Sequence, residues 1–235
     1  MNTNRLDRHT RKLIRKRISQ VLSQFLLIGV ILFITAGSLD WVWAWVYLAV
    51  GLTSTLIATP IMLSKNPEVI AERAEIKKDT KQFDRTFMVY SLILTLGMYI
   101  TAGLDYRFGW TDYYPLYFYL VGFTLTASGN VMLYWAMISN KYFSRSVRIQ
   151  EERHHRVVNG GPYNYVRHPG YSGLILSLIG TPLLLGSLWA LIPAVLVIPG
   201  YVVRTILEDR TLHKGLAGYK VYAQQTRFRL IPGIW

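Results

Sequence analysis

The sequence predicts an all-α, multi-pass transmembrane protein of about six spans, the last two of which form a helical hairpin. Of its 235 residues, 51% are hydrophobic, and many lie in long runs without a charged side chain. About 20 such residues are enough to cross a bilayer as a helix. A soluble domain of this size rarely contains several runs of that length, so we expect one integral membrane domain.

The uncharged runs define the spans. The first four fit one span each, whereas the fifth has 34 residues and as a single helix would be roughly 51 Å long, which is too long for one crossing. Pro182, Gly186 and Ser187 lie inside it and favour a break. We therefore predict a hairpin that turns near Gly186 and Ser187. The five runs are residues 21–39, 41–63, 86–104, 113–138 and 170–203.

The basic residues predict the topology. Of the 26 Lys and Arg side chains, seven lie before residue 21, six in residues 64–85, six in residues 139–168 and six from Arg204 onward, which leaves Arg107 on the other side. The positive-inside rule makes the four basic segments cytoplasmic, and with them both termini. The simple topology favours a bacterial plasma (inner) membrane. Because a membrane explains the net charge of +13, a nucleic-acid partner is disfavoured, and membrane lipids are the expected partners.

Three parts follow one another along the chain. Residues 1–20 form a basic cytoplasmic segment expected on the membrane surface, residues 21–138 a four-span region, and residues 139–235 a loop, the hairpin and a C-terminal tail. After the second span, Asn66-Pro67-Glu68 is typical of a helix start, with Asn as the cap and Pro in the first turn. We expect a short interfacial helix there, either as part of a ligand entrance or as a connector. Its helically spaced side chains are Val69, Ile70, Arg73 and Ile76.

The loop before the hairpin carries the chemistry. It is polar, aromatic and basic, and residues 160–173 read GGPYNYVRHPGYSG. Its glycines let the backbone approach a ligand closely. Hydrogen-bond donors come from Gln150, His155, Arg167 and His168, and flat faces from Tyr163, Tyr165 and Tyr171. Such a set suits a ligand that combines a carboxylate, a planar ring and a cation. No His, Asp or Glu cluster has metal-ligand spacing, so we expect no metal, and without Cys there is no thiolate site.

These residues resemble the signature of the isoprenylcysteine carboxyl methyltransferase family. The positions that fit are His155, Val157, Val158, Gly161, Tyr163, Arg167, His168, Pro169, Tyr171 and Gly173, while Asn159 stands where Thr is usual. A second block is similar to the family's C-terminal pattern, with Asp209 in place of a second Glu. It comprises Arg204, Glu208, Asp209, Leu212, Gly218, Tyr219, Tyr222, Leu230, Ile231 and Pro232. The resemblance covers about residues 140–235.

The resemblance implies a membrane enzyme that takes S-adenosylmethionine from the cytosol, releases S-adenosylhomocysteine and methylates a lipid-like acceptor from the bilayer. This cofactor has the carboxylate, ring and cation that the loop residues suit. Loop and tail flank the hairpin on the same side, so one cytoplasmic cofactor pocket can draw on both. The cofactor contacts are assigned to Gln150, His155, Val157, Gly161, Tyr163, Arg167, His168, Tyr171 and Glu208.

Arg204 and Glu208 are the predicted catalytic pair. They lie four residues apart, on one helical face at the end of the last span. If the acceptor is a carboxylate, Arg204 orients it and Glu208 holds Arg204. If the acceptor is an amine, Glu208 is the base. The alternative is an interfacial salt bridge without a catalytic part.

Other functions stay open at this point. A phospholipid amine N-methyltransferase fits an apolar groove equally well. An NADPH-dependent membrane reductase of the sterol or steroid type has a similar RHPxY-like stretch, and a non-catalytic membrane scaffold is the third alternative. A soluble Rossmann-type methyltransferase is disfavoured because the sequence has no GxGxG loop. The sequence does not specify the acceptor or the oligomeric state.

Overall fold

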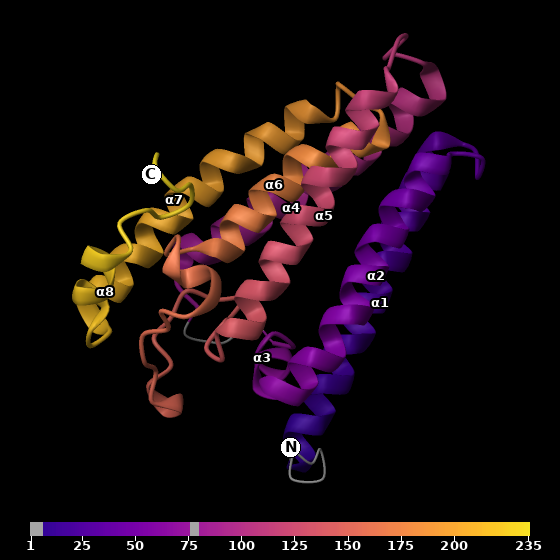
Figure 1. Ribbon diagram of the computed structural model, residues 1–235. Coiled ribbons are helices and arrows are strands. Elements are labelled where there is room, and N and C mark those ends of the chain that lie inside the picture. Colours follow the sequence, from indigo (N-terminus) through magenta and orange to yellow (C-terminus); the bar gives the residue numbers. More distant parts are fainter. Residues whose placement is uncertain (1–6, 76–79) are drawn as a thin grey trace.

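The protein is all-helical, as predicted. The computed structural model describes residues 7–75 and 80–235, and regular structure within them consists of helices alone (Figure 1). Ile76, one of the side chains expected on the interfacial helix, lies outside the described residues. The elements are α1 (Arg8–Ala36), α2 (Val42–Lys65), α3 (Pro67–Glu72), α4 (Gln82–Phe108), α5 (Leu116–Ser139), η2 (Glu151–Arg153), η3 (Gly161–Asn164), α6 (Pro169–Leu185), α7 (Leu191–Gly215) and α8 (Tyr219–Gln225).

The long helices have the length and composition of membrane spans. Among the described residues, five helices (α1, α2, α4, α5 and α7) are long and apolar enough to cross a membrane. The sixth, α6, is apolar but has only 17 residues, which corresponds to about 26 Å of helix. The multi-pass architecture is therefore confirmed, and a sixth crossing by α6 stays a prediction.

The predicted hairpin is present and turns where the sequence indicated. Gly186 ends α6 with φ 77°, the left-handed conformation that glycine adopts without strain. Asp105 of α4 fixes the turn by accepting a hydrogen bond from the Ser187 hydroxyl (2.5 Å). Asp105 also accepts from the Thr111 backbone N–H (2.8 Å) and hydroxyl (2.8 Å). The carboxylate thus ties the hairpin turn to the α4–α5 connection.

The first helix starts earlier than predicted. The basic residues from Arg8 onward continue into the first span as one helix, α1, instead of forming a separate segment on a surface (Figure 1). Asp7 caps this helix by accepting from the Thr10 N–H at 2.7 Å, which provides the helix start that the hydropathy pattern did not reveal. The boundary predicted at residue 20 therefore lies inside α1.

The interfacial helix is also present, with a different cap. Asn66 precedes α3 and Pro67 opens it, but the Asn66 side chain makes no capping bond. Its amide instead donates to the Ile138 carbonyl at 2.7 Å. That bond links α3 to the end of α5, while Val69 and Ile70 are buried beneath α3. α3 is therefore packed against the bundle.

Two packed regions hold the bundle together. One lies at the hairpin end and joins α1, α2, α4 and the α6–α7 turn, with Leu32, Trp41, Met98 and Leu185 at its centre. The other joins α1, α2, α3 and α5 at the basic end. Between α5 and α6 the backbones are in direct contact, since a Cβ at Gly129 would lie 2.5 Å from the Gly173 carbonyl oxygen. In Figure 1, α1 and α2 form a pair set beside the group of α4, α5, α6 and α7.

Candidate active site

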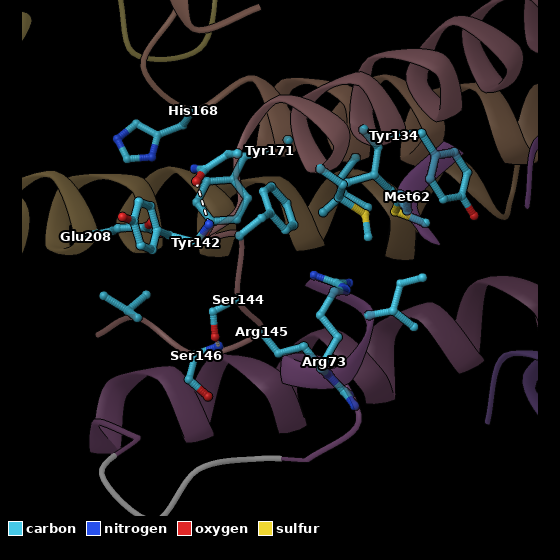
Figure 2. Close-up of a pocket in the computed structure, with 18 of the residues that line it drawn as sticks. Met62, Arg73, Tyr134, Tyr142, Ser144, Arg145, Ser146, His168, Tyr171 and Glu208 are labelled. Carbon is cyan, nitrogen blue, oxygen red and sulfur yellow. Dashed lines mark hydrogen bonds between the residues drawn. The ribbon is translucent and has the colours of Figure 1, made fainter. Parts of the chain in front are cut away.

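One large cavity of about 930 Å³ lies at the basic end of the bundle. Its polar end is lined by His155, Tyr163, His168, Tyr171, Arg204 and Glu208. Its apolar end is lined by Phe25, Leu52, Leu56, Leu92, Leu133 and Leu174, which come from α1, α2, α4, α5 and α6. Figure 2 shows His168, Tyr171 and Glu208 at one end of the pocket and Met62 and Tyr134 at the other. The cavity can therefore hold a polar ligand and an apolar ligand in contact.

The loop and the tail build the polar end together. The backbone N–H groups of Arg167 and His168 donate to the carbonyls of Phe228 and Arg229, both at 2.9 Å. The Ser172 hydroxyl donates to the Leu230 carbonyl at 2.6 Å. The tail thus continues past α8 and pairs with the chain just before α6, as expected from the antiparallel arms of the hairpin.

Asp209 is the centre of this pairing. Arg167 Nη2 donates a hydrogen bond to Asp209 Oδ2 at 3.1 Å, and Arg167 Nε lies at ion-pair distance, 2.9 Å, from Asp209 Oδ1. The Tyr219 hydroxyl donates to Asp209 at 2.8 Å, and Arg229 Nε donates at 3.1 Å. His168 Nε2 lies 3.4 Å from the same carboxylate. A buried anion with this many donors is a strong structural clamp.

Arg167 therefore has a structural task. Besides Asp209, its guanidinium donates to three backbone carbonyls, those of Ala223, Thr226 and Arg227, at 3.2, 3.2 and 3.3 Å. It lines the cavity, yet most of its donors are engaged with the tail. His168 keeps its ring parallel to Tyr171, with centroids 5.8 Å apart, and both line the cavity.

Arg204 has a partner that the sequence did not reveal. Its Nη2 lies 2.9 Å from Asp84 Oδ1, and Asp84 is fully buried in the first turn of α4. The same Nη2 donates to the Arg145 carbonyl at 2.6 Å. The prediction that Glu208 holds Arg204 is wrong, because Asp84 does so from a helix distant in the sequence. In the sequence, a carboxylate just before the third uncharged run is the signal that could have indicated Asp84.

Glu208 instead accepts a hydrogen bond from the Tyr171 hydroxyl. Tyr171 also lies under the Arg204 guanidinium, 5.3 Å from its ring centroid. Glu208 is the one carboxylate among the described residues that line the cavity. It is therefore the group that can meet a cation at the polar end.

His155 contributes a neutral ring. Burial and the positive charge of Arg153 lower the pKa of His155 to about 4, so the imidazole is uncharged at neutral pH. Its Nδ1 accepts the backbone N–H of Gln150 at 3.4 Å, which leaves Nε2 to carry the proton. The ring packs on Tyr142 with centroids 4.3 Å apart.

The structure brings most of the predicted site residues together. Arg204, Glu208, His155, Val157, Tyr163, Arg167, His168 and Tyr171 all line the cavity. Gln150 does not, because its amide donates to the Tyr142 carbonyl (2.6 Å) and accepts from Arg153 (2.6 Å). Gly161 does not either. It adopts φ 62° and packs on α5, where a Cβ would lie 2.5 Å from the Ser139 hydroxyl.

Fold and site together define a class: a multi-pass helical membrane protein with one cavity that joins a polar, aromatic chamber to an apolar groove. Residues 120–214 match the model of the isoprenylcysteine carboxyl methyltransferase (ICMT) family. The matched residues include the loop and the Arg204 to Leu212 part of the second block, which confirms the resemblance of these motifs.

Curated proteins with similar sequences carry related names. Protein-S-isoprenylcysteine O-methyltransferase B of Arabidopsis thaliana is 34% identical over 65 residues, which is 27% of this chain and 33% of that protein. A probable protein-S-isoprenylcysteine O-methyltransferase of Oryza sativa subsp. indica is 28% identical over 108 residues, 45% of this chain and 56% of that one. The chain thus spans between a third and just over half of the length of these relatives.

A solved structure of the eukaryotic intramembrane Ras methyltransferase ICMT is also similar. It covers 97% of this chain and 99% of its own, with 17% sequence identity and a TM-score of 0.49.

Proposed function

We propose that this protein is an integral membrane methyltransferase that uses S-adenosylmethionine and acts on the carboxylate of a lipid-like acceptor of the isoprenylcysteine type. One observation carries the proposal. A single cavity joins a polar chamber to an apolar groove between the α1–α2 pair and α4, α5 and α6. The chamber is built from residues 160–173, called the RHP loop below, and from the C-terminal tail. A soluble methyl donor and an oily acceptor can meet there, away from water.

The residues of the polar end fit S-adenosylmethionine. Tyr163, Tyr171 and the neutral His155 offer ring faces and a donor for an adenine. Glu208 provides the anion for the cationic part of the ligand, and His168 lies beside it in the cavity. When bound, S-adenosylmethionine supplies an electrophilic methyl group on a sulfonium.

The chain's own residues mainly position the reactants. A carboxylate acceptor is already nucleophilic and needs no base, so the protein must align it and exclude water. Arg204 can orient it, since its guanidinium lines the cavity and is held by Asp84 and the Arg145 carbonyl. Tyr171 keeps Glu208 in place through its hydroxyl. The apolar lining of α2 and α4 keeps this end of the cavity dry.

The charge of the cavity favours an anionic acceptor over an amine. Seven arginines and one carboxylate are found among the described lining residues. Arg148, Arg167 and Arg204 have carboxylate partners outside the lining, and the excess that remains attracts an acid and repels an ammonium. This observation supports a carboxyl methyltransferase over a phospholipid amine N-methyltransferase.

The test uses the purified full chain in a mild non-ionic detergent. Calorimetry should give binding heat with S-adenosylhomocysteine and none with NADPH. Incubation with radiolabelled methyl donor and N-acetyl-S-farnesylcysteine should give a base-labile methyl ester, and incubation with phosphatidylethanolamine should give no product. Binding heat with NADPH alone would indicate a reductase. No binding heat with S-adenosylhomocysteine or with NADPH would indicate a non-catalytic scaffold.

A pair of variants tests the role of Glu208. Glu208→Gln removes the one carboxylate of the cavity lining and should leave a folded protein with methyl transfer reduced about 100-fold or more. Glu151→Gln is the matched control, because Glu151 is exposed and outside this cavity. Turnover by Glu208→Gln at the rate of the control would remove Glu208 from the mechanism.

A further inference from the structure

Three half-buried arginines of the cavity lining have no acidic partner among the described residues. Arg17 comes from α1, Arg73 follows α3, and Arg145 lies in the loop after α5. Among the described residues, none of the three lies within ion-pair distance of a carboxylate. The three other buried or half-buried arginines of the lining, Arg148, Arg167 and Arg204, are each paired with an Asp or Glu.

The Arg73 side chain is the most constrained of the three. Its Nε is buried and has no hydrogen-bond partner in the described part of the chain, and its guanidinium lies 5.2 Å from the centroid of the Phe143 ring. Burial, together with the positive charges of Arg17 and Arg145, lowers the pKa of Arg73 to about 9. Three like charges gathered at a half-buried site are unfavourable by themselves, and a bound anion would reverse that cost.

The nearby carboxylates are already engaged. Glu72 pairs with Arg148 at 2.9 Å, Glu75 with Lys16 at 2.7 Å, and Asp84 with Arg204 at 2.9 Å. Within residues 7–75 and 80–235, the hydrogen-bond partner of Arg17 is the side-chain oxygen of Gln20, at 3.5 Å. The protein thus leaves this part of the cavity positive.

The surroundings of the three arginines are apolar. The cavity lining next to them includes Ile18, Met62, Ile70, Leu133, Met137 and Phe143. Figure 2 shows Arg73 and Arg145 together at one edge of the pocket, between the His168, Tyr171 and Glu208 end and the Met62 and Tyr134 end. A ligand for this place needs an anionic head and a hydrocarbon chain.

We propose that Arg17, Arg73 and Arg145 form a binding site for the phosphate of an anionic lipid, separate from the polar end that holds Glu208. Guanidinium groups bind phosphate in a planar, bidentate manner, and three of them from three elements can surround one phosphate. The hydrocarbon chain lies along the groove between the α1–α2 pair and α4 and α5. The three arginines are distinct from the residues assigned to methyl transfer, although the lipid chain shares the apolar groove that the proposed function gives to the acceptor.

The experiment measures lipid binding to the full chain by native mass spectrometry in a non-ionic detergent. Oleoyl lysophosphatidic acid should bind about tenfold or more tightly than monoolein, which has the same chain without the phosphate. The triple variant R17Q/R73Q/R145Q should remove this preference. The triple variant R15Q/R210Q/R227Q loses the same charge at exposed positions outside the cavity and should retain it.

Three outcomes would overturn the proposal: equal binding of the two lipids, an unchanged preference in R17Q/R73Q/R145Q, or an equal loss in both triple variants. Displacement of the lipid by millimolar inorganic phosphate would also refute it, because the site would then select a free anion. If R17Q/R73Q/R145Q does not fold, the single variant Arg73→Gln decides by the same criterion. S-adenosylhomocysteine binding, measured on the same samples, reports separately on the proposed function.

Discussion

The Arg204–Asp84 pair gives the sharpest prediction. Asp84→Asn keeps the shape of the side chain and an oxygen that can accept the Val147 N–H, now bonded at 2.8 Å. The substitution removes the charge that lies 2.9 Å from Arg204 Nη2. Arg204 then remains 8% exposed, with the Arg145 carbonyl as its one strong partner.

The magnitude follows from the burial of both groups. Breaking a buried pair by removing one partner costs about 3–5 kcal/mol. The Arg145 carbonyl and the adjoining cavity moderate the effect, so we expect the lower limit, about 3 kcal/mol, or roughly 100-fold in an equilibrium constant. Because Arg204 lines the cavity, part of this cost should appear as weaker acceptor binding and slower methyl transfer.

The assay is a double-mutant cycle. Asp84→Asn, Arg204→Gln and the double variant are compared by kcat/KM for N-acetyl-S-farnesylcysteine, the test acceptor of the proposed function, and by unfolding temperature in detergent. We expect strong non-additivity, with a coupling of about 1–3 kcal/mol. Asp112→Asn is the control, since Asp112 is exposed. Additive effects of the two substitutions would refute the view that Asp84 acts by holding Arg204.

Three further changes should have measurable effects. Asp209→Ala leaves the buried Arg167 without its carboxylate and should destabilise the protein by about 3–5 kcal/mol. The unfolding temperature is compared with that of the exposed control Asp40→Ala. An equal effect of the two substitutions would contradict a structural role for Asp209. Gly173→Ala places a Cβ 2.6 Å from the Gly129 carbonyl oxygen and should lower the free energy of unfolding by about 1–3 kcal/mol. Gly97→Ala meets no atom within 4 Å and should be neutral or stabilising. Similar unfolding temperatures of the two variants would disprove the close α5–α6 contact. The pKa of His155 is lowered to about 4 in the folded state, below that of an unfolded histidine, so its contribution to stability is complete above about pH 6.5 and is lost as the pH falls toward 4. The unfolding temperature should therefore fall less over this range in His155→Gln than in the unchanged protein, and parallel curves would argue against a buried neutral ring.

Much of this architecture was predictable from the sequence because it depends on one-dimensional properties. Uncharged runs give span length, so α2, α4, α5 and the hairpin at Gly186 were found within a few residues, whereas α1 begins before its uncharged run and α7 ends after its own. The alternation of basic and uncharged segments indicated that one end of the bundle is basic. The RHP loop and the block that begins with Arg204, Glu208 and Asp209 identified most of the residues at the polar end of the cavity. Both segments flank one hairpin and must meet at its open end.

The remaining features were decided by packing between segments far apart in the chain. Asp84 became the partner of Arg204 because α4 packs against α7. The Gln150 side chain is bonded to Tyr142 and Arg153 and does not line the cavity. Its residue type and its position in the sequence suited a ligand contact equally well. The clamp around Asp209 depends on the tail folding back onto the loop.

By itself, then, the sequence determined the helical class, the hairpin and the loop that lines the polar end of the cavity, because hydropathy, charge and motif are local. Only the tertiary structure decided which carboxylate neutralises which arginine, and which arginines are left without one. The physical reason is that a buried charge takes its partner from whichever element packs against it, and neighbours in space are not neighbours in the chain.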